Sequence, residues 1–288
     1  LRGGFVEFLH NLPFYGLAVV CVDDPGVRSI LGAIGRSVVT YGIDEGADLR
    51  AVNIEFSEST TEFDVVRSDS VARSKGDTFG NVSPLMHVRL RLPGIHNVRN
   101  ALAAIAVADE LQVGMDAVTA ALENFQGIDR RFQSLGDVRT ENGTVTIIDD
   151  YGHHPTEVAA TLAAAKSGYP DRRVVLVFQP HRYSRTRDLM DDFAIVLSEA
   201  DVLVLLDVYA AGEDAIAGAD GRSMARAIRA RGTVDPVFVE HLDDLAEVLA
   251  GVVADGDIVL TMGAGDIGAC AQTLPERLGT GPTLKVHA

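Results

Sequence analysis

The sequence contains no tryptophan and only two cysteines among its 288 residues. Cys21 and Cys270 lie far apart and have no CxxC spacing, so neither a zinc site nor a disulfide framework is predicted. No apolar run approaches the roughly 20 residues that a membrane helix needs, and no basic stretch followed by an apolar core opens the chain. These absences favour a protein of the reducing cytoplasm.

Positive charge is also scarce. The chain has 25 Lys and Arg against 41 Asp and Glu, and its net charge of -16 would repel nucleic acid phosphates and anionic membrane surfaces. None of its few lysines lies in a GxxxxGK[ST] phosphate loop. Arginines nevertheless gather in two short segments, at Arg130, Arg131, Arg182, Arg185 and Arg187. We therefore expect an anionic small molecule as the partner, and neither nucleic acid nor a membrane.

Length and patterning predict an α/β fold in two domains, residues 1–135 and 136–288, each with its own core. In the first part we expect helices near 1–11, 25–31, 101–110 and 115–124, and strands near 18–22, 38–41, 51–56, 62–67 and 86–92. The later strands are predicted to form an antiparallel patch, with the polar stretch 68–83 before the last of them. Phe125 to Leu135 is predicted to be a connector.

The second part contains five strand and helix alternations. Strands are expected near 145–149, 174–178, 202–206, 236–239 and 258–261, and helices near 156–166, 188–199, 223–231, 244–253 and 267–278. Such alternation predicts a parallel, doubly wound sheet. Sheets of this kind bind ligands beyond the carboxyl ends of their strands.

The first candidate site follows the strand that ends at Asp149 and Asp150, where YGHHPT (151–156) leads into a helix. Side chains alternate along a strand, so the two carboxylates face opposite sides of the sheet. The helix start presents free N–H groups at the same place. One carboxylate, two imidazoles and a helix N-terminus are therefore expected to converge. The alternative is structural, because Asp and Thr often cap helices and histidines in turns are often hydrogen-bonding residues.

A second cluster follows the next apolar strand along the chain. The sequence QPHRYSRTR (179–187) comes directly after Val174–Phe178, whose unbroken apolar run is typical of a buried parallel strand. We expect these two strands to be neighbours in the sheet. Both clusters would then lie at one edge.

Two further patterns are weighed against simpler explanations. GAGDIG (263–268) satisfies GxGxxG, but the chain ends before an acidic residue about 20 positions later could hold a ribose, so we reject a dinucleotide fingerprint. Asp149, Asp150, His153 and His154 as metal ligands would indicate a metal-dependent hydrolase. That hydrolase ranks second, because among the other strand ends only Asp207 could add a ligand. A module that only binds a ligand is the alternative that is not an enzyme.

Four motifs, in this order, resemble those of the Mur ligases. They are LPGIHNVRNA (92–101), GIDRRF (127–132), DDYGHHPT (149–156) and PHRYSRT (180–186), and the likeness runs from Phe5 to about Leu278. The first motif is shared across the family, whereas the last two are similar to those of members that join L-alanine to UDP-N-acetylmuramate. The nearest alternative is a sister ligase that attaches a recycled tripeptide to the same sugar nucleotide. That sister shares HHPT but lacks PHRxxRT.

The resemblance implies a domain order. Family members have an N-terminal Rossmann-like domain for the uridine diphosphate, a central ATPase domain opened by a Gly-Lys-Thr loop, and a C-terminal Rossmann-like domain for the amino acid. This chain resembles the C-terminal part of the central domain over 1–135 and the C-terminal domain over 136–288. We expect the remaining parts to precede Leu1 and this chain to be inactive alone. A homodimer is left open.

The resemblance also implies nucleotide contacts. ATP and magnesium are expected, with most magnesium ligands in the preceding part. Asn97 and Asn100 would hydrogen-bond adenine, Arg131 would reach the ATP phosphates, and Asp150 would hold the ribose hydroxyls.

The reaction implied by the resemblance forms an amide through an acyl phosphate. Arg182 and Arg185 would grip the acyl phosphate or a substrate carboxylate, for which a planar guanidinium is well suited. His154, with His153 and His181 as further candidates, would orient the amine or the substrate. A structural role for the histidines is an equal alternative.

Overall fold

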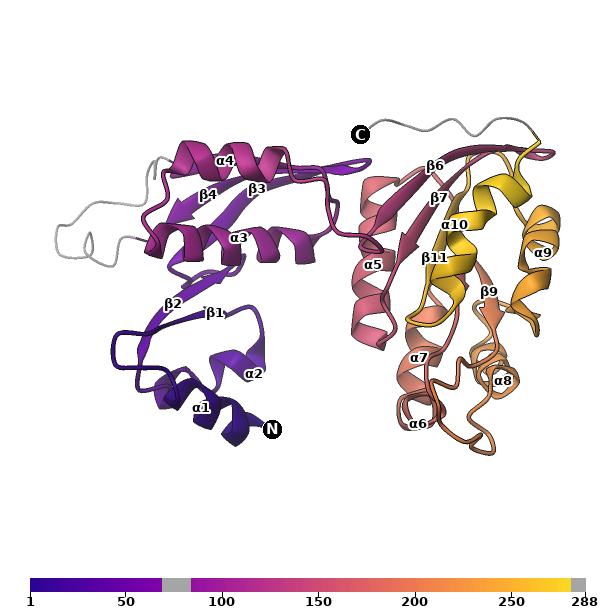
Figure 1. Ribbon diagram of the computed structural model, residues 1–288, viewed down its shortest axis with the longest axis horizontal. Coiled ribbons are helices and arrows are strands. Elements are labelled where there is room, and N and C mark those ends of the chain that lie inside the picture. Colours follow the sequence, from indigo (N-terminus) through magenta and orange to yellow (C-terminus); the bar gives the residue numbers. More distant parts are fainter. Residues whose placement is uncertain (69–83, 281–288) are drawn as a thin grey trace. The chain divides into compact units, whose positions relative to one another are not determined.

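The computed structural model describes residues 1–68 and 84–280, so the polar stretch predicted at 68–83 lies, except for Ser68, outside the described residues. The chain forms two compact units, Leu1–Phe125 and Gln126–Ala288 (Figure 1). Each unit has its own buried hydrophobic core. The compact units divide after Phe125. The predicted domain boundary lies ten residues later, after residue 135, and stays a prediction.

The first unit contains a five-stranded sheet in the order β1-β2-β3-β4-β5. Its strands are β1 (Leu17–Cys21), β2 (Ser37–Gly42), β3 (Leu49–Ser57), β4 (Thr60–Arg67) and β5 (Met86–Leu90). The first three strands run parallel to one another, whereas β4 is antiparallel to both β3 and β5. The predicted antiparallel patch is therefore confirmed.

The helices of this unit are α1 (Arg2–His10), α2 (Pro25–Arg28), the 3-10 helix η1 (Leu31–Ala33), α3 (Ile95–Glu110) and α4 (Met115–Glu123). Helix α3 buries Leu102 and Ile105 in one cluster with Phe63 of β4. It begins at Ile95 rather than near Ala101 as predicted, because Gly94 at φ +100° ends the preceding extended segment and starts the helix. Asn97 and Asn100 therefore lie on helical turns.

The second unit contains a six-stranded sheet in the order β10-β9-β8-β11-β7-β6. Its strands are β6 (Gln133–Thr140), β7 (Gly143–Asp150), β8 (Val174–Phe178), β9 (Val202–Leu206), β10 (Val237–Val239) and β11 (Ile258–Met262). All neighbours are parallel except β6 and β7. The predicted parallel sheet is confirmed, with one antiparallel strand added at its edge.

Two predictions about this sheet are wrong. Strands β7 and β8 are not neighbours, because β11 from the end of the chain lies between them and pairs with both. The connector predicted up to Leu135 already contains the start of β6. A register shift between Ser134 and Gly136 interrupts the alternation of β6, which hides this strand in the sequence.

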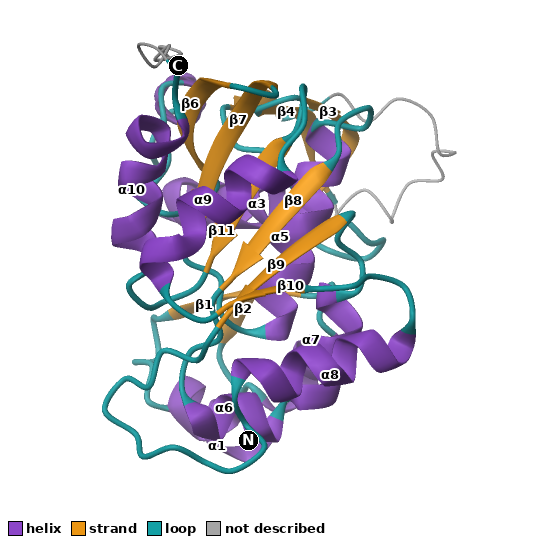
Figure 2. Ribbon diagram, turned by 90° about the vertical axis from the view of Figure 1, so that its right-hand side faces the viewer, coloured by secondary structure: helices purple, strands orange, loops and turns teal. Residues whose placement is uncertain are grey.

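Helices cover both faces of this sheet (Figure 2). Those on one face are α5 (Pro155–Gly168), α7 (Met190–Leu197) and α8 (Gly221–Arg231), and those on the other are α9 (Leu245–Val252) and α10 (Ile267–Leu278). Two short helices, α6 (Tyr183–Asp188) and η3 (Leu242–Asp244), complete the unit. The helix predicted at 188–199 occurs as α7, and Leu189 separates it from α6.

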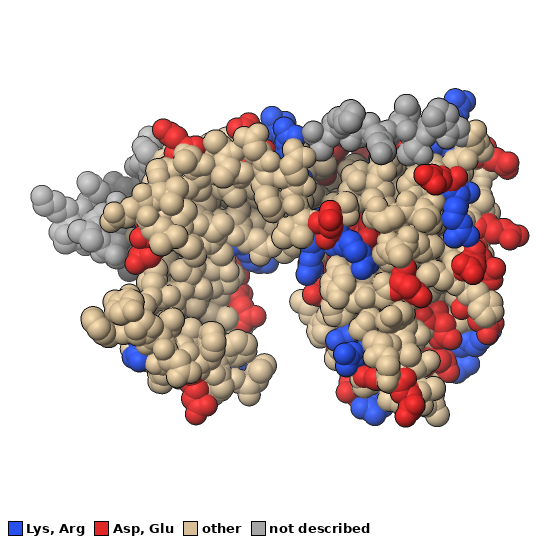
Figure 3. Space-filling model, viewed as in Figure 1, with Lys and Arg blue, Asp and Glu red and all other residues tan. Residues whose placement is uncertain are grey.

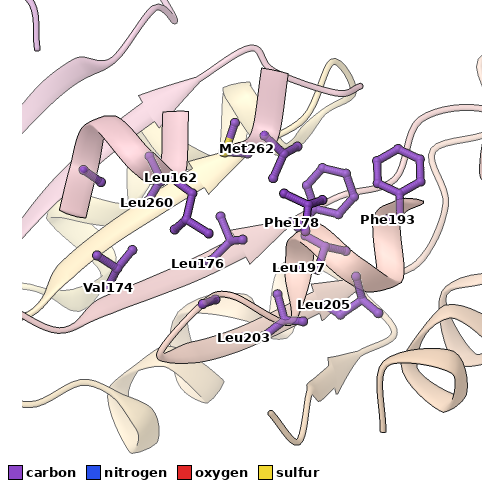
Figure 4. Close-up of a cluster of buried hydrophobic side chains, with 14 of the residues drawn as sticks. Leu162, Val174, Leu176, Phe178, Phe193, Leu197, Leu203, Leu205, Leu260 and Met262 are labelled. Atoms are coloured by element: carbon purple, nitrogen blue, oxygen red, sulfur yellow. The ribbon is translucent and has the colours of Figure 1, made fainter. Parts of the chain in front are cut away.

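The core explains why the central strands β8 and β9 are apolar throughout. Along β8, Leu176 and Phe178 belong to the cluster that holds Phe193 and Leu197 of α7 (Figure 4). The intervening Val177 belongs to the cluster on the opposite face. A strand that is buried on both faces needs apolar residues at consecutive positions, which leaves polar groups for its carboxyl end.

On the face shown in Figure 3, acidic and basic side chains of the second unit are interspersed. In the described parts of the chain, no helix is long and apolar enough to cross a membrane.

Candidate functional site

The candidate site lies at the carboxyl edge of the second sheet, where parallel strands β7, β11, β8 and β9 end side by side. Because β11 separates β7 from β8, its following loop, Gly263–Asp266, lies between the two clusters predicted from the sequence. The site is therefore built from four strand ends rather than two.

Asp149 and Asp150 have different partners, as their alternation predicts. Asp149 is fully buried and accepts hydrogen bonds from Thr261 Oγ1 at 2.8 Å and Arg130 Nε at 2.9 Å. Asp150 accepts from the backbone N–H groups of Phe132 at 2.9 Å and Gly152 at 2.7 Å. Asp149 thus holds Arg130 in place, and Asp150 holds both Phe132 and the turn after β7.

The surroundings of Asp150 make its charge costly. Burial raises the pKa of its carboxyl group, while the N–H groups of Gly152 and Phe132 and the nearby Arg131 guanidinium oppose that rise. The net pKa lies above the ordinary value. A buried carboxylate with two backbone donors and a neighbouring cation is a group that the fold has arranged in a fixed orientation.

Arg130 and Arg131 both lie over the ring of Tyr151, at 5.1 and 5.7 Å from its centroid. Arg130 also donates to the carbonyl oxygen of Gly263, which ties the segment before β6 to the loop after β11. The exposed Arg131 has no such ties among the described residues. Arg131 is therefore the arginine of this pair that can meet a ligand, and sequence reasoning overlooked the anchoring role of Arg130.

His154 caps helix α5. Its Nδ1 accepts from the N–H of Thr156 at 3.3 Å, and Glu157 Oε2 accepts from the N–H groups of His153 and His154 at 2.9 and 3.1 Å. Burial raises the pKa of Glu157. These N–H donors and the nearby His153 together lower the pKa by more than burial raises it, so the net pKa lies below the ordinary value. The histidine that ranked first in the sequence has a structural task at the helix start.

Aromatic rings connect the two clusters across the sheet edge. The ring of His153 lies 5.3 Å from Tyr151 and 5.7 Å from His181, measured between centroids. His181 in turn stacks on Tyr209 at 5.5 Å with an interplanar angle of 18°. The structure thus brings together residues that follow β7, β8 and β9, although β7 and β8 are not adjacent. Tyr209 had no signal in the sequence beyond its place after an apolar strand.

Arg182 has an unusual backbone conformation at the start of α6. Its φ of +72° lies in the region that favours glycine, and its N–H donates to Tyr209 O at 2.9 Å. The guanidinium is half exposed and lies 3.6 Å from Glu213. Glu213 accepts from both the N–H and the hydroxyl of Ser184, at 2.9 and 2.7 Å. Strained backbone that neighbouring contacts maintain is a common feature of functional sites.

The GAGD loop after β11 is fixed by Gln179. Its Nε2 donates to Asp266 at 2.6 Å, its Oε1 accepts from the N–H of Ile267 at 3.1 Å, and its own N–H donates to Met262 O at 3.0 Å. Gly263 has φ +147°, and a Cβ there would lie 2.8 Å from Gln179 O. Gly263 therefore allows the close approach of two backbone segments.

Asn97 and Asn100 belong to the first unit, in the first turns of α3. Asn97 donates to Pro93 O at 2.8 Å and accepts from Asn100 at 3.4 Å. Nearby, Arg99 Nε donates to the buried Asp23 at 2.7 Å, and Asp23 also accepts from the N–H of Ile43 at 2.9 Å. Asp23 and Arg99 thus fix the start of α3 against the strand ends of this unit.

Metal binding has little support in these contacts. Within residues 1–68 and 84–280, no group of three or more His, Cys, Asp or Glu side chains is arranged to hold a metal ion. Asp207, the additional ligand considered for a hydrolase, instead accepts from the N–H groups of Val208 and Gly221 at 2.8 and 2.9 Å. The oxygens of Asp149 and Asp150 are similarly engaged by protein donors.

Comparisons with known proteins match this fold along most of the chain. Residues 4–108 match the family model described as "Mur ligase middle domain", and residues 130–265 match "Mur ligase, glutamate ligase domain". A UDP-N-acetylmuramate–L-alanine ligase of Methylococcus capsulatus is 52% identical over 280 residues, which cover 97% of this chain and 57% of that protein.

Two solved structures of Thermotoga maritima proteins are also similar. A UDP-N-acetylmuramate–alanine ligase superimposes with a TM-score of 0.72 and 28% identity, covering 96% of this chain and 54% of that one. A MurF ligase in complex with ADP gives a TM-score of 0.67 with 18% identity, covering 95% and 56%, and at that identity it shows the fold alone. The chain spans little more than half the length of these proteins.

Proposed function

The chain belongs to the Mur ligase family, and we propose that it takes part in the ATP-dependent joining of L-alanine to the carboxylate of UDP-N-acetylmuramate, a step of peptidoglycan precursor synthesis. The observation that carries this proposal is the 52% identity to a ligase of that name over 97% of the chain. The reaction belongs to the cytoplasm, which the free thiols of Cys21 and Cys270 support.

The chemistry has two steps. The muramoyl carboxylate attacks the γ-phosphorus of ATP, which gives an acyl phosphate and releases ADP. The neutral amine of alanine then attacks the acyl carbon, and the tetrahedral intermediate expels phosphate and loses a proton to leave an amide. Both steps develop negative charge on oxygen, so hydrogen-bond donors and guanidinium groups at fixed positions accelerate them.

The carboxyl edge of the second sheet supplies such groups from Arg131, Arg182 and Arg185, and we call it the cationic edge. Arg182 has a half-exposed guanidinium and Arg185 follows one turn later in α6, so the acyl phosphate or the alanine carboxylate is their proposed ligand. His153 and His181, which contact each other at this edge, orient the substrate. His154 is the weakest of the three histidines for this role, because its Nδ1 caps α5.

Nucleotide contacts are proposed separately for each unit. Asn97 and Asn100 at the start of α3 bind adenine, and their exposed or half-exposed amides support this. In the second unit, the exposed Arg131 binds ATP phosphates. Asp150 binds the ribose hydroxyls through lone pairs that Phe132 and Gly152 leave unused. Magnesium would neutralise phosphate charge when bound, but the described residues offer it no cluster of ligands, so no step here depends on it.

The test measures ADP release and amide formation with the chain alone and with the same sequence fused to the part of the Methylococcus capsulatus ligase that it does not match. We expect the fusion to require ATP, UDP-N-acetylmuramate and L-alanine, and to transfer 18O from the muramoyl carboxylate to phosphate, as an acyl phosphate demands. Matched reactions use glycine, serine and a tripeptide in place of alanine.

Three results would contradict the proposal. One is turnover with the tripeptide but not with alanine, which would indicate the recycling ligase. Another is metal-dependent phosphatase activity that disappears in His153→Ala, which would indicate the hydrolase. The third is a fusion that binds alanine yet forms neither ADP nor amide, which would indicate a binding module.

A further inference from the structure

One nitrogen of Arg185 contacts a ring nitrogen of His181. Arg185 Nη1 lies 3.2 Å from His181 Nδ1 and 3.0 Å from the carbonyl oxygen of the same residue. A guanidinium only donates hydrogen bonds, so Nδ1 must accept one. A neutral imidazole has one donor and one acceptor, which leaves the proton on Nε2.

The surroundings hold the His181 ring in this orientation. Its face stacks on Tyr209, and a parallel bridge joins the backbone of His181 to Tyr209. A flip of the ring would exchange Nδ1 for a C–H group and lose the contact with Arg185. Among the residues that the structure describes, Nε2 has no hydrogen-bond partner, so its N–H can donate to a ligand.

We infer that His181 is a fixed, neutral hydrogen-bond donor through Nε2–H, and that Arg185, besides the ligand contact proposed for it, acts as a positioning residue that sets this tautomer through Nη1. The tautomer follows from the contacts alone, whereas the identity of the acceptor, a carboxylate or phosphoryl oxygen, rests on the proposed function. In this arrangement His181 is not the base that deprotonates the amine, because one nitrogen is occupied and the other already carries a proton.

The charges around His181 favour the neutral ring. The titratable groups that face it are Arg185 of α6, Arg182 just before that helix, His153 from the turn after β7, and Glu213 and Tyr209 from the segment after β9. Burial lowers the pKa of His181 below 6.5, and Arg185, His153 and Arg182 lower it further, against a smaller opposing effect of Glu213. The neutral Nε2–H tautomer is therefore present at neutral pH. As the pH falls through the lowered pKa, Nε2 keeps its proton, but protonation at Nδ1 places a second donor against Arg185, so the hydrogen bond that fixes the ring is lost.

Nitrogen NMR on this chain tests the tautomer without any need for catalysis. In 15N-labelled protein, the His181 signals are assigned by their disappearance in His181→Gln, and two-bond couplings identify the protonated nitrogen. We expect Nε2–H in the wild-type chain. In Arg185→Met we expect a mixture of tautomers and a pKa that rises toward 6.5.

The matched control is Arg187→Met, which alters an exposed arginine of the same helix that pairs with Asp188. This change is expected to leave the His181 signals as they are. A proton on Nδ1 in the wild-type chain, or an Arg185→Met spectrum that equals the control, would overturn the inference.

A kinetic comparison in the fusion described above tests what the donor does. A glutamine side chain can place an N–H near the position of Nε2, whereas asparagine places its amide near Nδ1. We expect His181→Gln to keep kcat/KM for alanine within about tenfold and to lose the acidic limb of its pH profile, and His181→Asn to fall further. Equal losses in both variants would overturn the donor role. A wild-type fusion without ligase activity would instead contradict the proposed function and leave the NMR result standing.

Discussion

Arg130 and Arg131 are adjacent in the sequence but have different surroundings. The side chain of Arg130 is 21% exposed and pairs with the fully buried carboxylate of Asp149, whereas Arg131 is exposed. A buried carboxylate that loses its cation must carry its charge uncompensated or take up a proton. The stability of the second unit should therefore depend on the first arginine and not on the second.

We predict that Arg130→Met lowers the free energy of unfolding by about 3–5 kcal/mol, because it leaves Asp149 buried without its partner. The matched change Arg131→Met removes a contact with the ring of Tyr151 and an exposed charge near Asp150, but no hydrogen-bonded ion pair, and should cost less than about 1 kcal/mol. Urea unfolding, monitored by circular dichroism, measures both. Equal effects of the two substitutions would show that the ion pair between Arg130 and Asp149 adds no stability of its own.

A pH-dependent prediction concerns Asp23 in the first unit. Burial raises the pKa of Asp23. Arg99 and the N–H groups of Asp44 and Ile43 together lower the pKa by more than burial raises it, so the net pKa lies below 3.8. An acid whose pKa is lower in the folded state adds stability above its unfolded pKa. That stability is lost as the pH falls through the folded value.

Asp23→Asn should therefore cost about 1–2 kcal/mol at neutral pH, a figure reduced for the partly exposed Arg99. The difference from wild type should shrink below about pH 4. Asp44→Asn, which alters an exposed carboxylate, is the control and should change little. Unfolding curves across this pH range decide the matter, and a difference that stays constant at low pH would contradict the account.

The sequence predicted part of this residue-scale organisation. Alternation along a strand was enough to place Asp149 and Asp150 on opposite sides. Their partners could not be predicted, because Arg130 reaches Asp149 only with positive φ angles at Arg130 and Phe132, and meets Gly263 only after β11 has entered the sheet. Contacts of that kind depend on the assembled fold.

At the scale of elements, the loop after β11 leaves little room for a side chain at Gly263. Gly263 combines φ +147° with a backbone oxygen, Gln179 O, at 2.8 Å from the position of an added Cβ. We predict that Gly263→Ala lowers the free energy of unfolding by about 1–3 kcal/mol, since both the conformation and the close approach are strained.

A glycine elsewhere gives the opposite sign. Gly251 lies within α9, and an added Cβ there would have nothing within 4 Å. Gly251→Ala should therefore stabilise the protein by about 0.5–1 kcal/mol, because alanine is the better helix former. Chemical denaturation of the two variants compares them directly. A Gly263→Ala protein as stable as wild type would mean that the loop is not fixed as described.

Element positions were more predictable than element neighbours. Strands buried on both faces are apolar runs, and all five predicted for the second unit occur. Their order was not predictable, because every such strand has the same pattern and the position of β11 depends on how the helices cross over. For the same reason the sequence predicted the segments after β7 and β8 as parts of the site, but not that the GAGD loop after β11 and Tyr209 after β9 would lie beside them.

At the scale of the whole molecule, the two units divide the proposed task. The first carries Asn97 and Asn100 on α3, and the second carries the cationic edge with Arg131, Arg182 and Arg185. The net charge of -16 means that these arginines must attract an anion against an acidic background, which restricts binding to ligands that fit them closely. The central claim is that Arg182 at this edge contacts the substrate.

The most direct test measures kcat/KM for L-alanine in the fusion protein with Arg182→Ala and, as the control, Arg187→Ala in helix α6, which follows Arg182. A charge-assisted hydrogen bond contributes about 1.5–3 kcal/mol, so the account predicts a loss of about tenfold to a hundredfold for Arg182→Ala. The control should stay within about twofold of wild type. If Arg182→Ala also stays within about twofold, the carboxyl edge of this sheet is not where the substrate binds.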